Sequence, residues 1–291
     1  MQHAVCVPNF GPGITVDLLA GWARLAEEAG WDGFFLWDHL FAFDPGPVEV
    51  VDPWMTLAVA AGRTHRIRLG TLVTPLPRRR PVEVARQTVT LDHLSGGRAV
   101  LGVGIGAFPF EWGHLGEEPD LRARGRMLDE HLELLVRLWS GEPVVHRGEF
   151  YRAAPGADDP AWAAECHPRP VQAPRIPVWV GGTWPGGPPF RRAARWDGVV
   201  PMRADGPWQV EDTAAVTAAV AAHRDPGAGP LDVVVPGETD GADPSRHDLM
   251  AAHADAGATW WQEAVHPWRF GWQGGRPLPQ RQMEERIAAG P

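Results

Sequence analysis

The sequence predicts an α/β fold, a closed TIM-like (β/α)8 barrel formed by a single domain. Eight short apolar runs alternate with segments whose apolar residues recur at helical spacing, and this alternation is typical of a parallel sheet covered by helices. The runs are almost continuously apolar, as expected for strands that are buried on both faces. A chain of 291 residues is long enough for one such barrel. The pattern alone leaves a doubly wound open sheet as the alternative fold.

The clearest unit is a β-α-β segment over residues 67–107. An apolar strand leads into a loop rich in proline and arginine, and Pro81 then suits the first turn of a helix. This helix is predicted to stop at Ser95-Gly96-Gly97, because glycine permits a left-handed cap. A second apolar strand runs from Ala99 to Val103. The crossover is long enough to join two parallel strands.

The same reasoning places the remaining elements in order. The other strands are predicted at residues 4–10, 33–37, 178–180, 198–201, 231–235 and 259–265. The other helices are predicted at residues 16–29, 53–63, 122–139, shortly after 186–189, and at 210–222, 245–256 and 280–289. The weak apolar alternation of residues 144–152 predicts a short hairpin outside the main sheet. Residues 155–174 show no periodicity and are predicted to be irregular. We therefore expect one domain over residues 1–291, with an irregular insertion around residues 107–175.

The composition excludes several classes of function. The net charge of -9 and the isoelectric point near 5.7 argue against a nucleic-acid-binding protein, which normally has a basic face. The sequence contains no lysine, so Schiff-base and P-loop lysine chemistry are excluded. No run approaches the roughly 18 apolar residues of a membrane span, and no secretory signal is evident. We expect a cytoplasmic protein with neither a membrane nor a nucleic-acid partner.

No metal site is expected. The two cysteines, Cys6 and Cys166, are too few for a disulfide framework, and no CxxC or HExxH spacing occurs. The twelve histidines are scattered, with no pair at metal-ligand spacing on one predicted element.

The candidate site follows from the fold. In a (β/α)8 barrel the active site lies at the carboxyl ends of the strands, an end that we call the mouth. Trp37-Asp38-His39 follows the second strand, and a histidine beside a carboxylate can act as an acid or a base near neutral pH. A structural histidine would give the same pattern. Other residues expected at or near the mouth are Phe10, Leu72, Val73, Thr74, Gly104, Gly106, Phe108, Glu111, Gly181, Gly182, Thr183, Trp184, Arg203 and His266.

Two glycine-rich turns and one arginine run need separate interpretation. Gly181-Gly182-Thr183 precedes a turn and a helix, where backbone N–H groups can bind a phosphate, although the turn alone would also require glycine. Gly104-Ile105-Gly106 is not a GxGxxG fingerprint. Arg78-Arg79-Arg80 is interpreted as a solvated charge run.

Several stretches together resemble the luciferase-like family of flavin-dependent monooxygenases and F420-dependent oxidoreductases. They are Asp38-His39, LGTLVTPLPRRRPVEVARQTVTLDHLSGGRAVLGVG, and PVWVGGT followed by RRAARWDGVVP. The resemblance covers nearly the whole chain, and its central stretch is the most specific part. It implies a TIM-like barrel that binds F420 or reduced FMN across the mouth, with no metal.

The resemblance also implies roles for individual residues. Asp38 and His39 would match a catalytic pair, with His39 close to the reactive ring. A non-prolyl cis peptide under that ring would be Leu72–Val73, give or take one bond, followed by Thr74. Gly104 and Gly106 would line the ring, and Gly181–Thr183 would hold the phosphate. Many F420-dependent relatives place a glutamate directly after the fourth strand, where this chain has Ala107, so that Glu111 is the nearest acid.

We expect hydride transfer between F420 and a small, largely apolar organic substrate, with His39 exchanging a proton. The aromatic residues Phe10, Trp37, Phe108 and Trp184, together with Glu111, Arg203 and His266, would line the substrate pocket, and Trp268 is a further candidate. An FMN-dependent monooxygenase using reduced flavin and O₂ is the close alternative. A non-catalytic flavin-binding barrel and a flavin-free, metal-dependent hydrolase stay open. A separate flavin or F420 reductase and a second copy of the chain are the candidate partners.

Overall fold

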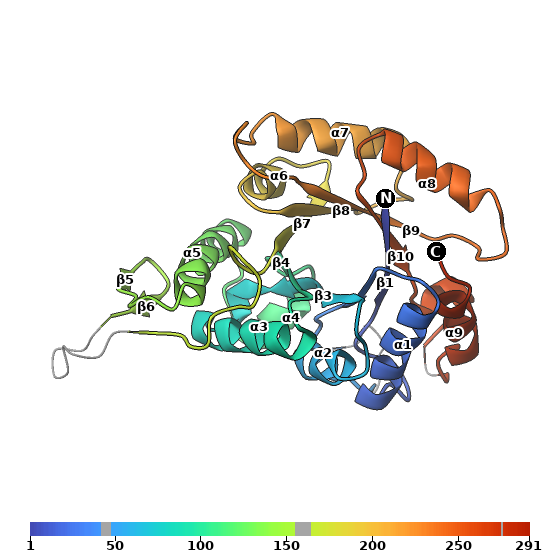
Figure 1. Ribbon diagram of the computed structural model, residues 1–291, viewed down its shortest axis with the longest axis horizontal. Coiled ribbons are helices and arrows are strands. Elements are labelled where there is room, and N and C mark those ends of the chain that lie inside the picture. The colour runs from blue at the N-terminus through green and yellow to red at the C-terminus, as the bar shows by residue number, and fades with distance from the viewer. Residues whose placement is uncertain (42–47, 155–163, 275) are drawn as a thin grey trace.

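The computed structural model describes residues 1–41, 48–154, 164–274 and 276–291. Within these residues, parallel strands form a closed barrel in the order β1-β10-β9-β8-β7-β4-β3-β2 (Figure 1). The barrel strands are β1 (Gln2–Val7), β2 (Gly33–Leu36), β3 (Arg68–Pro75), β4 (Ala99–Gly104), β7 (Val178–Trp184), β8 (Gly198–Arg203), β9 (Asp232–Gly237) and β10 (Trp260–Ala264). The predicted closed barrel is therefore confirmed, and the open doubly wound sheet is excluded.

The helices cover the outside of the barrel. Their ranges are α1 (Val16–Glu28), α2 (Pro53–Ala61), α3 (Pro81–Ser95), α4 (Pro109–Gly113), α5 (Leu121–Trp139), α6 (Pro188–Ala193), α7 (Val210–Ala221), α8 (Arg246–Asp255) and α9 (Gln280–Ala288), with 3₁₀ turns at Leu76–Arg78 and Pro267–Phe270. Figure 1 shows α7 and α8 along one side of the barrel and α1, α2 and α3 along the opposite side.

Local sequence explains where these helices begin and end. The Thr15 hydroxyl accepts a hydrogen bond from the Leu18 N–H at 3.1 Å and caps α1. The Asp52 carboxylate caps α2 in the same way, accepting from the Met55 N–H at 2.8 Å. Gly96 ends α3 with φ +65°, a left-handed conformation that favours glycine. The predicted limits of α3 are confirmed at both ends.

Other predicted elements differ in length or were missed. β7 extends to Trp184, four residues beyond the predicted strand, because it keeps pairing with β8 as far as Arg203. β1 ends at Val7, three residues early, and Phe10 instead forms a separate bridge with Val50. The short helix α4 and both 3₁₀ turns were not predicted, because so few residues show no measurable periodicity.

The predicted hairpin lies outside the barrel. Strands β5 (His146–Arg147) and β6 (Arg152–Ala153) form an antiparallel pair of their own, far from α1 and α9 in Figure 1. The predicted irregular stretch 155–174 falls partly on residues 155–163, which lie outside the described residues. The rest of it, residues 164–174, contains no helix or strand.

The core has two layers. One layer fills the barrel and consists of Ala4, Cys6, Phe35, Leu72, Val100, Trp179, Val200, Val234 and Trp260. The other layer lies between the strands and the helices. Large aromatic side chains fill the barrel interior, so the barrel is a packed core and not a pore.

Strand β3 is irregular where it reaches the mouth. The Leu72–Val73 peptide bond is cis, as the resemblance implied. The register with β4 shifts between Thr71 and Thr74. This local bulge is the point at which β3 departs from regular pairing.

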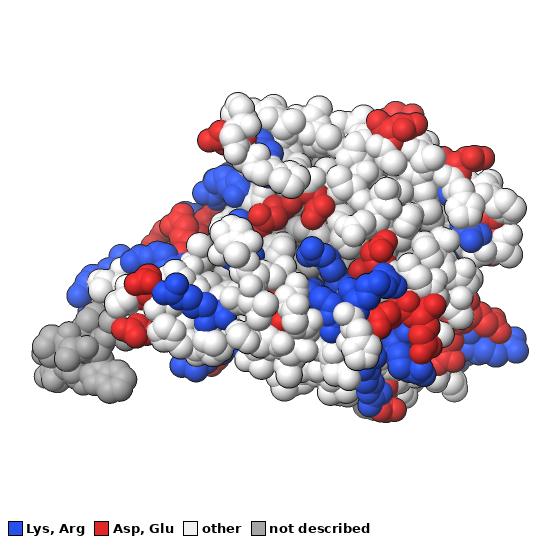
Figure 2. All heavy atoms as spheres, in the orientation of Figure 1, with Lys and Arg blue, Asp and Glu red and all other residues white. Residues whose placement is uncertain are grey.

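The surface shows no extended region of one charge on the face in Figure 2, where acidic and basic side chains are interspersed among the described residues. Among the same residues, no helix is both long and apolar enough to cross a membrane.

Candidate active site at the barrel mouth

The backbone of His39 is held by a buried asparagine. The Asn9 side-chain N–H groups donate to the carbonyl oxygens of His39 and Val51, both at 2.9 Å. The Asn9 side-chain oxygen accepts from the His39 N–H at 3.1 Å. Asn9 is the single asparagine of the chain, and it is fully buried. Sequence reasoning missed it because the strand was predicted to continue through residue 10; the available signal was a polar side chain within that apolar stretch.

The neighbouring carboxylate, Asp38, is locked in place and turned away from the solvent. One Arg79 nitrogen, Nη2, lies 2.8 Å from each Asp38 oxygen. The Thr74 hydroxyl donates to Asp38 at 2.7 Å, and Trp54 Nε1 donates in turn to Thr74 at 3.2 Å. With its side chain only 1% exposed, Asp38 orients the end of β2 and is not a base open to solvent.

The carboxylate that reaches the His39 ring is Glu111, on α4. Its Oε1 lies 3.2 Å from His39 Nδ1 and accepts from the Leu40 N–H at 2.7 Å. Its Oε2 lies 3.4 Å from Arg78 Nη2. Burial raises the pKa of Glu111, but the hydrogen bonds from His39 and Leu40 and the charge of Arg78 outweigh it, so the pKa lies below its ordinary value. Glu111 is therefore an ionised, fully buried carboxylate.

The interpretation of Arg78-Arg79-Arg80 as a solvated run is wrong for two of the three residues. The Arg78 side chain is 3% exposed and that of Arg79 is 16% exposed. They pair with Glu111 and Asp38 respectively, whereas Arg80 is exposed. The 3₁₀ turn after β3 separates the two guanidinium groups, so that each reaches a different carboxylate beside His39.

An apolar surface lies at the end of β3 between two glycines. A Cβ atom on Gly104 would lie 2.8 Å from Val73 Cγ2, and one on Gly181 would lie 3.1 Å from Val73 Cγ1. The absence of both side chains lets Val73 sit between β4 and β7, partly exposed beside Leu72. Gly106 has φ +94° and packs on Trp112. A flat ring fits such a surface, since it needs apolar contact without projecting side chains.

Gly181–Thr183 lies within β7, and the segment from there to α6 contains fewer anion-binding groups than the sequence suggested. The first two positions of α6 are Pro188 and Pro189, which have no N–H to donate. Gly182 is required for packing, because a Cβ atom there would lie 2.3 Å from Pro189. The exposed guanidinium of Arg191 lies beside Gly187 and is the nearest positive charge on α6.

Arg203 and Trp184 are placed differently from the expectation. Arg203 Nη1 lies 2.9 and 2.8 Å from the two Asp212 carboxylate oxygens, at the start of α7. Trp184 packs edge-on against Phe190 of α6, with ring centroids 5.1 Å apart. Both side chains therefore have partners on the helices that follow β7 and β8.

His266 is engaged through both ring nitrogens. Nδ1 accepts from the Arg269 N–H at 3.2 Å, and Nε2 lies 2.9 Å from Glu238 Oε1. Nδ1 must therefore be unprotonated, and Nε2 donates. This hydrogen bond to His266 lowers the pKa of Glu238. His266 supports the neighbouring Trp37 and Trp268 rings, at centroid distances of 6.2 and 5.7 Å.

Aromatic rings surround His39. Phe10, Trp37 and Phe108 have ring centroids 5.9, 5.8 and 5.4 Å from the His39 ring. Trp268 is 36% exposed and its ring is nearly parallel to Trp37, at 15°. The structure thus brings together the predicted Phe10, Trp37, His39, Phe108 and Glu111.

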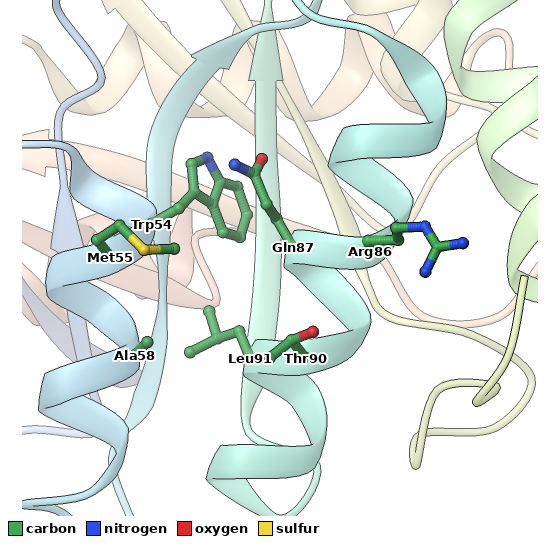
Figure 3. A pocket seen from close by; sticks show the side chains of 7 residues that line it. All are labelled: Trp54, Met55, Ala58, Arg86, Gln87, Thr90 and Leu91. Carbon is green, nitrogen blue, oxygen red and sulfur yellow. The ribbon is translucent and has the colours of Figure 1, made fainter.

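Two cavities lie away from His39. One is a groove between α2 and α3, lined by Trp54, Met55, Ala58, Arg86, Gln87, Thr90 and Leu91 (Figure 3). The other lies beside α9 and the loop after β9. Within the described residues, no group of three or more His, Cys, Asp or Glu side chains could hold a metal ion, and both cysteines are free.

The pattern of one family, described as luciferase-like monooxygenase, matches residues 2–274. The chain belongs to this family. An uncharacterized Mycobacterium tuberculosis protein is 36% identical over 197 residues, which cover 62% of this chain and 65% of that protein. The F420-dependent glucose-6-phosphate dehydrogenase of Nakamurella multipartita is 35% identical over 180 residues, which cover 61% of this chain and 48% of that protein. The 4-hydroxyprotoasukamycin monooxygenase of Streptomyces nodosus subsp. asukaensis is 40% identical over 140 residues, which cover 47% of this chain and 35% of that protein. This luciferase-like chain thus matches 65% or less of the length of each of these curated relatives.

Solved structures confirm the fold of this luciferase-like chain. The F420-dependent tetrahydromethanopterin reductase of Methanopyrus kandleri superposes with a TM-score of 0.70 at 17% identity, covering 99% of this chain and 96% of that one. A monooxygenase from Streptomyces bottropensis superposes with a TM-score of 0.69 at 21% identity. The superposition covers 99% of this chain and 98% of that one.

Proposed function

We propose that this chain is an F420-dependent oxidoreductase in which His39 exchanges a proton while a hydride moves between cofactor and substrate. The observation that supports the proposal is the contact between His39 Nδ1 and the buried, ionised Glu111. When bound, F420 would supply the hydride chemistry, and the protein supplies orientation and electrostatics.

The contact assigns a role to each ring nitrogen. A carboxylate accepts hydrogen bonds only, so His39 Nδ1 keeps its proton toward Glu111 and Nε2 is the nitrogen that gains or loses one. Asn9 fixes the backbone of the same residue. Asp38 and Arg79 hold the end of β2, so the ring is oriented before any ligand arrives.

The residues at the mouth fit a flat cofactor ring. Leu72 and Val73 would contact its face, and Gly104 and Gly106 would leave room at its edge. Backbone N–H groups of Gly181, Gly182 and Thr183 would hold the phosphate, with Arg191 nearby. Each assignment follows the family resemblance together with the apolar surface described above.

The substrate that fits best is small, uncharged and partly aromatic. Aromatic rings surround His39, whereas Arg78, Arg79 and Arg203 are paired with Glu111, Asp38 and Asp212. A sugar phosphate, as named for some relatives, would need a cation that those pairs have already engaged. We also propose that the enzyme is cytoplasmic and that its single domain, residues 1–291, forms a homodimer. A separate reductase would supply the reduced cofactor.

The similarity to the 4-hydroxyprotoasukamycin monooxygenase favours a monooxygenase as the second candidate, for which FMN would be the cofactor. The two are separated by titrating the purified protein with F420 and with FMN and following tryptophan fluorescence, since Trp37 and Trp268 lie beside the proposed ring site. Micromolar binding of F420 supports the proposal, and His39→Ala should then abolish turnover while largely sparing binding.

The other outcomes identify the alternatives. Binding of FMN alone supports the monooxygenase. Binding without turnover, unaffected by His39→Ala, indicates a non-catalytic barrel. Failure to bind either cofactor, with stoichiometric metal by elemental analysis, would move the chain to the metal-dependent hydrolase.

A further inference from the structure

Arg78 is a buried cation with few partners. Its side chain is 3% exposed, and its ion-pair distances are 3.4 Å to Glu111 and 3.8 Å to Glu117. Its Nε and Nη1 atoms make no hydrogen bond within the described residues. Burying a guanidinium group is costly unless a nearby carboxylate compensates for it. A surface position would have avoided this cost, so the location requires a reason.

The carboxylate of Glu111 divides its two oxygens between different partners. Oε1 takes His39 Nδ1 and the Leu40 N–H, while Oε2 faces Arg78. Arg78 and His39 thus contact different oxygens of one fully buried carboxylate. The charge of Arg78 adds to the effects of His39 and Leu40 that lower the pKa of this carboxylate, and the ionised carboxylate accepts the Nδ1 proton of His39 in a hydrogen bond.

We propose that Arg78 is a positioning residue, which acts through Glu111 to fix the proton-bearing nitrogen of His39 and to set the pH at which His39 takes up its second proton. The inference deepens the proposed function and rests on it for its catalytic meaning. The electrostatic claim itself concerns only side chains of this chain.

The other charges near His39 form pairs of their own. Asp38 is paired with Arg79, and Glu238 is paired with His266, whose ring neighbours Trp37. On the α4 and α5 side, Glu117 lies 3.6 Å from Arg124, and His114 packs on Phe110. Among the described residues, Glu111 is the charged side chain that contacts the His39 ring, and Arg78 is a cation that pairs with Glu111, so the two charges act on the ring in opposite directions.

The signs of the two effects follow from elementary electrostatics. The negative Glu111 stabilises the imidazolium form, so Glu111→Gln should lower the pKa of His39. The positive Arg78 disfavours the same form, so Arg78→Gln should raise it. We expect each substitution to move the titration midpoint by about one pH unit, the order of magnitude for adding or removing one charge near a partly buried group.

The test is a histidine-selective NMR titration of the full chain without cofactor. The chain has 12 histidines, so the His39 signals are assigned by their loss in His39→Gln. The ¹⁵N shifts report the tautomer and the titration midpoint together. Arg80→Gln is the matched control, because Arg80 belongs to the same run and is exposed.

The expected result is a midpoint that moves up in Arg78→Gln, moves down in Glu111→Gln and stays fixed in Arg80→Gln. A midpoint and tautomer that do not respond to Arg78→Gln would overturn the proposal. If Arg78→Gln does not fold, Arg78→Lys keeps the charge and should retain the wild-type tautomer and midpoint. If the His39 midpoint of Arg78→Lys moves by about one pH unit, or its tautomer changes, the proposed role of Arg78 is also overturned.

This measurement is separate from the test of function. If F420 does not bind and the His39 midpoint still responds to Arg78, the proposed function fails and the electrostatic coupling stands. If F420 binds and the midpoint does not respond, only the role of Arg78 fails.

Discussion

At the scale of single residues, the site depends on polar side chains that reach across the fold. Asn9 holds the His39 backbone from the segment after β1, Arg79 holds Asp38 from the turn after β3, and Glu111 reaches the ring from α4. Each of these contacts joins residues that are 30 or more positions apart. The arrangement therefore exists only in the completed barrel, and its members stabilise the fold as well as the site.

Asn9→Ala should destabilise the protein by about 2–4 kcal/mol, because it leaves buried backbone groups of His39 and Val51 without hydrogen bonds. Urea unfolding at pH 7 measures the change, and Gln282→Ala on the exposed face of α9 is the control for loss of a side-chain amide. An Asn9→Ala midpoint equal to that of the control would show that water replaces these bonds.

At the scale of elements, the close approach of β3, β4 and β7 shapes the mouth. Val73 occupies the space that side chains on Gly104 and Gly181 would take. The strand ends thereby form a smooth apolar surface, and each glycine is required by its neighbour across the sheet.

Gly104→Ala should cost about 1–3 kcal/mol, because the new methyl group would lie 2.8 Å from Val73 Cγ2. Val73→Ala should relieve the contact. The double variant should therefore be destabilised by less than the sum of the two single destabilisations. Gly21→Ala in α1, where nothing lies within 4 Å, should instead stabilise by about 1 kcal/mol. Additive single and double effects at positions 73 and 104 would contradict this account.

The elements could be predicted from the sequence far better than the site contacts. Apolar periodicity is a local signal, so each barrel strand was recognised and α3 was predicted to start at Pro81, where it does start. His39 and Asp38 were predicted because they follow a strand at the mouth, and Glu111 because the family resemblance left it as the nearest acid; their roles stay predictions. The partners of Arg78 and Arg79 could not be found, because a run of three arginines looks solvated until tertiary structure places a carboxylate beside it.

At the scale of the whole molecule, acid should weaken the fold before most carboxylates are protonated. Burial lowers the pKa of His131 to about 3, so this side chain stays neutral in the fold. The unfolded chain takes up that proton near pH 6.5. The resulting contribution to stability is complete above pH 6.5 and is lost as the pH falls toward 3.

His131→Leu should therefore flatten the dependence of stability on pH. Between pH 7 and pH 5 the wild type should lose about 2 kcal/mol through this residue alone, and the variant should not. Urea midpoints at the two values measure the difference, with the exposed His65→Gln as control. An equal loss in wild type and His131→Leu would show that His131 is protonated in the fold.

Closure of the barrel has a consequence for synthesis of the chain. β1 pairs with both β2 and β10, with Gln2 opposite Trp260 and Cys6 opposite Ala264. Because β1 precedes the other barrel strands in the chain, it keeps one open edge until β10 has been translated. An open edge is a template for pairing with other chains, and a contact between such distant residues forms late. Nascent chains of this protein should accordingly depend on chaperones that cover the edge of β1 until β10 emerges.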